Sequence, residues 1–119
     1  MFYIYMILAG ILHKYQYGSY HRGLIKQKYN IKGYVQDHHI IPRQFRSRVS
    51  LDLDNSNNII ILPTSYGKLF LDTRRPVHEN GHPKYNKYVE TLLDKNYTEL
   101  EIISILRKEL LHGNITRII

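Results

Sequence analysis

The sequence predicts one small domain of the α+β class, on the basis of three observations. Its 119 residues match the usual length of a single domain. Two short runs rich in β-branched residues, 34–41 and 59–62, each stop at a proline, which is typical of strands. Two later segments, which begin at Pro83 and Thr98, repeat apolar residues at helical spacing. The centre of the chain therefore reads strand, loop, strand, loop, helix, and a second helix follows.

Residues 1–33 are expected to form a flanking region that is apolar at first and then basic and aromatic. Residues 1–12 carry no charge, but they are too few to span a bilayer and lack the basic start of a signal peptide. We expect a buried element or a contact between subunits here, which makes a homodimer one option. Stable membrane insertion is not expected, and use at a membrane or in export is the alternative. Residues 22–29 fit a short helix that ends before Gly33.

The first predicted strand covers residues 34–41 and ends at Pro42. The tract 52–58 is rich in Asp and Asn, so we expect a turn there. The second strand, residues 59–62, is closed by Pro63, and a loop over residues 64–81 follows.

The first long helix is expected to begin at Pro83, because proline suits the first helical turn, and this places His82 at its N-cap. Its buried face is predicted to hold Tyr85, Tyr88, Val89, Leu92 and Leu93. Thr98 and Glu101 match a capping box at the start of the final helix, which should end near Gly113. The apolar residues of that helix are Leu100, Ile103, Leu106 and Leu110.

The charge balance favours a polyanionic partner. Seventeen Lys and Arg residues against ten Asp and Glu residues give a formal net charge of +7. Nucleic acid is therefore the first choice of partner, and an anionic membrane surface is the second. The absence of cysteine excludes a disulfide framework and every thiolate metal site. It also fits a reducing compartment, so we expect an intracellular protein, cytoplasmic or associated with a nucleus, with export as the alternative.

Four histidines suggest a metal site. His38 and His39 are adjacent, and His78 and His82 are separated by three residues, a spacing that lets two imidazoles share one cation. Without cysteine, the natural arrangement is three histidines and an open fourth position, which is the pattern of a catalytic metal. One of the adjacent histidines would then be free to act as a base beside the metal. The remaining histidines, which have no partner at a meaningful spacing, are interpreted as surface residues: His13, His21 and His112.

Adjacent strand residues point to opposite faces of a sheet. His38 and His39 can therefore serve one site only if the strand ends, bulges or twists strongly at this point. Strict alternation would instead pair Asp37 with His39, and Asp37 might then orient that histidine or bind the metal itself.

Three segments resemble a known family when they are taken in order. They read DHHIIP from Asp37, NSNNIIILP from Asn55 and VHENGHPKYNKYV from Val77. Together they resemble the HNH or His-Me finger (ββα-metal) nucleases, in the branch with an HH motif that includes bacterial toxin nucleases and nuclease colicins. The resemblance covers residues 34–93, about half of the chain. It implies a small ββα-metal core over residues 34–97, with 1–33 as a flanking region and 98–119 as a C-terminal helix.

The resemblance also implies roles for individual residues. His39 corresponds to the general base and His38 to a metal ligand. Asn58 corresponds to the middle Asn of the motif, which braces the loop between the strands and helps to hold the base. Because the tract is rich in asparagine, Asn55 or Asn57 is the alternative.

His82 corresponds to the metal ligand at the start of the helix, and His78 to either a third ligand or a phosphate contact. Two departures from the family pattern are the long loop before His78 and the proline directly after His82, Pro83. The proline puts in doubt whether the two histidines bind as a pair on one helix. We expect one divalent metal ion, with zinc, magnesium, manganese and nickel all open.

Two pairs of arginines are predicted to contact the nucleic-acid backbone. Arg43 and Arg46 follow the first strand, and Arg74 and Arg75 precede His78. Together with the resemblance, they predict a metal-dependent endonuclease that hydrolyses phosphodiester bonds in DNA, with RNA as the alternative substrate. A module that binds nucleic acid without cutting it, around a structural or degenerate metal site, is the alternative function. A membrane-associated effector that uses residues 1–12 is a third option.

Overall fold

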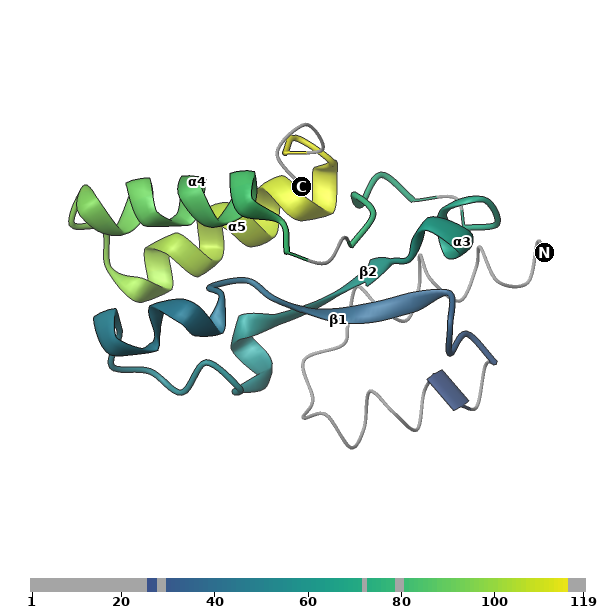
Figure 1. Cartoon of the computed structure of the whole chain (residues 1–119), viewed down its shortest axis with the longest axis horizontal. Helices are drawn as coiled ribbons and strands as arrows, with labels where there is room; N and C mark the ends of the chain where they lie inside the picture. The colour runs from purple at the N-terminus through teal and green to yellow at the C-terminus, as the bar shows by residue number, and fades with distance from the viewer. Residues whose placement is uncertain (1–25, 28–29, 72, 79–80, 116–119) are drawn as a thin grey trace.

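The computed structural model describes residues 26–27, 30–71, 73–78 and 81–115 (Figure 1). The apolar segment 1–12 and most of the helix predicted over residues 22–29 lie outside the described residues. Within them the chain forms β1 (Val35–His39), the 3-10 helices η2 (Arg43–Arg48) and η3 (Ser56–Asn58), β2 (Ile59–Pro63), and the α-helices α3 (Ser65–Lys68), α4 (Pro83–Asp94) and α5 (Glu99–His112). This order confirms the predicted α+β class.

The two strands form an antiparallel pair in which Val35 lies opposite Pro63 and His39 opposite Ile59. β1 ends at His39, two residues earlier than predicted. Beyond that point the amide of Ile40 donates to the Asn58 carbonyl at 2.7 Å, outside the strand ladder. β2 extends one residue further than predicted, because its last residue, Pro63, still faces Val35.

α4 and α5 run side by side on one side of the strand pair, and α3 lies near the far end of β2 (Figure 1). Both long helices contribute to the same hydrophobic core, so α5 is part of one packed unit with α4 and the strands. The core residues come from the segment directly after β1, from η2, from β2, from both long helices and from two turns: Ile40, Ile41, Phe45, Leu53, Ile60, Leu62, Tyr85, Val89, Leu92, Ile102, Ile103, Leu106, Leu110 and Ile115. In the part of the chain that the structure describes, no helix is long and apolar enough to cross a bilayer.

The ends of α5 match the prediction, but one of its apolar residues does not. Thr98 and Glu101 form the capping box, and Gly113 ends the helix with a φ of 74°. Leu100, however, is 72% exposed, whereas Ile102 is fully buried. At 3.6 residues per turn, Leu100 lies about 120° around the helix from Leu106, which is too far to reach the core.

The loop predicted over residues 64–81 contains a single helical turn, α3. The Thr64 hydroxyl caps it by accepting from the amide of Gly67 at 2.9 Å. A Cβ at Gly67 would lie 1.8 Å from the carbonyl oxygen of Tyr34, so only glycine allows this close approach. The turn thereby anchors the start of the long loop against the residue that precedes β1.

Candidate active site

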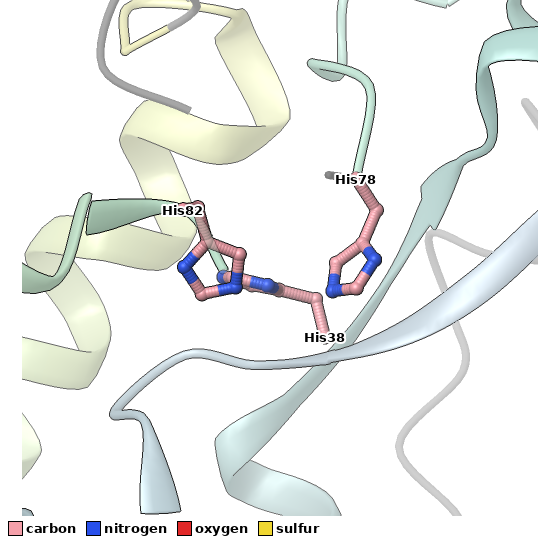
Figure 2. A group of neighbouring side chains, drawn as sticks. All are labelled: His38, His78 and His82. Atoms are coloured by element: carbon pink, nitrogen blue, oxygen red, sulfur yellow. The ribbon is translucent and has the colours of Figure 1, made fainter. Parts of the chain in front are cut away.

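Three histidine rings from three different segments point toward one another (Figure 2). His38 comes from β1, His78 from the loop before α4, and His82 from the N-cap of α4. The ring centroids of His38 lie 5.2 Å from His78 and 5.1 Å from His82, and those of His78 and His82 are 5.6 Å apart. One ring nitrogen from each lies within 4.8 Å of the others. The three histidines can therefore hold a single metal ion.

His38 is the buried member of this group, with 1% of its surface exposed. Burial, followed by the neighbouring imidazoles, lowers the pKa of His38 from 6.5 to about 2, so its ring is neutral. Neither ring nitrogen has a hydrogen-bond partner among the described residues. A buried polar atom without a partner is costly, and a neutral imidazole is the form that binds metal. A divalent ion therefore fits this donor set.

His78 is brought to the site by contacts with both strands. Its amide donates to the Pro63 carbonyl at 2.8 Å, and its Nδ1 donates to Gln36 Oε1 at 2.8 Å. Gln36 precedes His38 by two residues, so both side chains lie on the same face of β1. Because Nδ1 carries the proton, Nε2 of His78 is left free for a metal. Burial and the His82 ring lower the pKa of His78, which also favours its neutral form.

His82 is oriented by the first turn of α4. Pro83 occupies the first helical position, and the His82 side chain makes no capping hydrogen bond. Its Nδ1 instead donates to Asn86 Oδ1 at 3.1 Å. The side-chain Nδ2 of Asn86 donates in turn to Gln44 Oε1 at 3.1 Å. His78 therefore lies in the loop before α4 and His82 at its N-cap, so the two histidines do not form a pair on one helix.

His39 is not a member of this three-histidine group. Its Nε2 donates to Asp54 Oδ1 at 2.9 Å, whereas Asp37 forms an ion pair with Lys26 at 2.7 Å. Asp54 is thus the carboxylate that His39 contacts. A charge on His39 still lowers the pKa of both His38 and His78, so the candidate base lies close to the candidate metal site.

Asn58 joins three parts of the fold. It is fully buried, accepts from the amide of Ile41 at 2.8 Å, and donates to the carbonyls of Ile41 and Leu53 at 3.0 and 2.9 Å. Asn55 instead caps η3, and Asn57 is exposed. Of the three asparagines, only Asn58 is in a position to brace the loop between the strands, and its side-chain hydrogen bonds do not include His39.

The four arginines occupy different environments. Arg43 and Arg46 are exposed and both approach the Asp54 carboxylate, at 2.9 and 3.6 Å. Arg74 is exposed. Arg75 is only 7% exposed, and its guanidinium donates to the Ile61 carbonyl at 2.9 Å. This burial favours a structural role for Arg75, which ties the loop that carries His78 to β2, over the predicted phosphate contact.

The sequence interpretation missed four polar residues around the site: Gln36, Gln44, Asp54 and Asn86. For two of these residues, their position in the sequence could have indicated that they lie near the site. Gln36 shares the alternating face of His38, and Asn86 lies one helical turn after His82. Asp54 had no such indication, because nothing in the Asx-rich tract distinguishes it from Asp52.

The order of the elements and the histidine cluster are compatible with the expected nuclease, and a comparison with known families shows this class of protein. Residues 20–118 match the AHH family, a nuclease family of the HNH/ENDO VII superfamily with conserved AHH. The match covers most of the chain, so this protein belongs to that family of nucleases. Its adjacent histidines are His38 and His39, and the residue before them is Asp37 instead of alanine. No curated protein and no solved structure matches the chain.

Proposed function

We propose that the protein is a metal-dependent endonuclease that hydrolyses phosphodiester bonds in DNA. One observation carries this proposal: three histidines converge on one point, and both ring nitrogens of the buried His38 have no partner among the described residues, directly beside the further histidine His39. A structural core does not need such an arrangement, because burying an unpaired imidazole costs stability. A nuclease does need a cation and a base near the same phosphate.

His38, His78 and His82 would hold one divalent ion, which supplies Lewis-acid stabilisation of the negative charge that develops on the phosphate and the leaving oxygen. All three are imidazole donors, and the described residues that could share the ion include no carboxylate. This donor set favours zinc, nickel or manganese over magnesium, which prefers oxygen ligands.

The chain's own residues account for the remaining steps. His39 takes the proton from the attacking water, since imidazole titrates near neutrality. Arg43, Arg46 and Arg74 are exposed and bind backbone phosphates, which positions the substrate without reading its sequence. Asn58 keeps the residues that follow β1 in place through its three buried hydrogen bonds.

A plasmid-nicking assay tests this proposal. The full chain, loaded separately with zinc, nickel, manganese or magnesium, should convert supercoiled DNA to nicked circles, and a chelator should stop the reaction. His39→Ala should lose cleavage, by roughly 100-fold or more, while it keeps metal and DNA binding. The matched control is His112→Ala, which removes an exposed histidine at the end of α5.

The outcomes separate the two candidate functions. Full activity of the His39→Ala variant would refute the assignment of the base. A wild-type chain that binds DNA but cuts neither DNA nor RNA with any of the four metals would instead support a binding module.

A further inference from the structure

The candidate base has a carboxylate partner that no motif predicts. His39 Nε2 lies 2.9 Å from Asp54 Oδ1, and since a carboxylate only accepts, the ring nitrogen donates the proton. The other ring nitrogen of His39, Nδ1, makes no hydrogen bond with any described residue. The contact therefore selects one tautomer of the neutral imidazole and leaves one nitrogen able to accept a proton.

Asp54 is itself held by several groups. Its amide donates to Asp52 Oδ1 at 3.0 Å, which fixes the backbone of the turn. Its Oδ1 also accepts from Arg43 Nε at 2.9 Å, and Arg46 approaches Oδ2 at 3.6 Å. The hydrogen bonds from His39 and then Arg43 lower the pKa of Asp54, so the carboxylate is ionised at neutral pH. A fixed anion is a suitable partner for an imidazole that becomes positively charged during the reaction.

We propose that Asp54 is the positioning residue of His39: it accepts from Nε2 and so presents Nδ1 as the nitrogen that takes the proton from water. This inference rests on the proposed nuclease function, because it concerns the same base. Asp54 is not one of the candidate metal ligands, and in this role it acts through the orientation and tautomer of His39.

A different reading of the same contacts predicts the opposite result. Three cationic or proton-donating groups converge on the Asp54 carboxylate, as they would on a phosphate: His39, Arg43 and Arg46. If Asp54 occupied the place of a substrate phosphate, its removal would increase DNA affinity and the cleavage rate. The positioning role predicts a slower reaction, so the sign of the effect distinguishes the two.

The first test is steady-state cleavage by the metal-loaded full chain and its Asp54→Asn and Asp54→Ala variants. We expect kcat to fall roughly 10- to 100-fold with little change in KM, because the base is displaced while substrate binding remains. Asn keeps an acceptor without the charge and should lose less than Ala. The matched control is Asp94→Asn. Asp94 is an exposed carboxylate that pairs with Arg48 at 2.8 Å, and Arg48 belongs to η2, as Arg43 does. Asp94 has no histidine partner among the described residues.

The second test needs no activity. In a long-range proton–nitrogen NMR spectrum of the histidine-labelled chain, His39 should show a protonated Nε2, an unprotonated Nδ1 and slow exchange of the Nε2 proton with water. The slow exchange should disappear in Asp54→Ala and persist in Asp94→Asn. Equal exchange in wild type and Asp54→Ala would overturn the inference.

The two tests keep this inference distinct from the proposed function. An active wild type with an equally or more active Asp54→Ala variant overturns the positioning role alone. A wild type that is inactive with every metal overturns both, because there is then no base to position. Loss of kcat together with loss of the protected proton supports both.

Discussion

His38 combines two features that are unfavourable for a folded protein. It is an ionisable group in the core, and both of its ring nitrogens lack a partner there. Packing against Tyr85 helps to orient His38, since the centroids of the two rings lie 4.8 Å apart. The Tyr85 hydroxyl donates to the Ile40 carbonyl. Metal binding requires a neutral imidazole with an available lone pair, and the free energy of that binding would offset the cost of burying His38.

The lowered pKa of His38 predicts acid sensitivity of the metal-free protein. The pKa of His38 falls from 6.5 to about 2 on folding, so below pH 6.5 the unfolded chain binds a proton that the folded chain does not. The free energy of unfolding should therefore decrease as the pH falls from 6.5, by about 1.4 kcal/mol per pH unit, or about 2 kcal/mol at pH 5. The lowered pKa of His78 acts in the same direction.

Urea unfolding of the metal-free chain at pH 7 and pH 5 measures this effect. His38→Asn removes the group that titrates, so the difference in stability between the two pH values should shrink in this variant. An unchanged difference in His38→Asn would show that another group is responsible.

The candidate site is built from three segments of the fold, and each contributes at least one histidine. β1 places His38 on one face and His39 on the other, because adjacent strand residues alternate. The loop after α3 delivers His78, and it is tied to β2 through the amide of His78 and the guanidinium of Arg75. The start of α4 delivers His82, where Pro83 occupies the first helical position and the His82 side chain makes no capping hydrogen bond.

Asn58 ties together the segment between β1 and β2, and its removal should cost more stability than that of its neighbour. Asn58→Ala leaves the Ile41 amide and the carbonyls of Ile41 and Leu53 without their partner inside the fold. We expect a loss of on the order of 3 kcal/mol in the free energy of unfolding, measured by chemical denaturation. The control Asn57→Ala removes an exposed side chain of the same type and should change stability by less than about 0.5 kcal/mol. Equal losses in the two variants would refute the bracing role of Asn58.

For the whole molecule, the sequence predicted the class and order of the elements because both depend on local patterns. Proline after β-branched runs marked both strands, and the capping box at Thr98 marked the last helix. The partners of the site residues depend on contacts between distant segments. Asp54 meets His39 across 15 residues, and nothing local separates an exposed arginine such as Arg74 from its buried neighbour Arg75.

The three-histidine group was predictable for a different reason. The chain has no cysteine, so histidines were the natural ligands for a transition metal, and their spacing suggested His78, His82 and one of the adjacent pair. The family resemblance then indicated His38 as that third ligand. The sequence left open whether His39 shares their site. In the structure its Nε2 contacts Asp54, and its charge acts on His38 and His78, so the candidate base lies next to the candidate ligands with a partner of its own.

The proposed nuclease activity depends on one ion held by His38, His78 and His82. A titration of metal-free protein with zinc or manganese tests this dependence, with the initial rate of plasmid nicking followed against metal per chain. We expect no nicking without metal and a rate that levels off at about one ion per chain, as for a single three-ligand site. Nicking that proceeds at the same rate in excess chelator would contradict it.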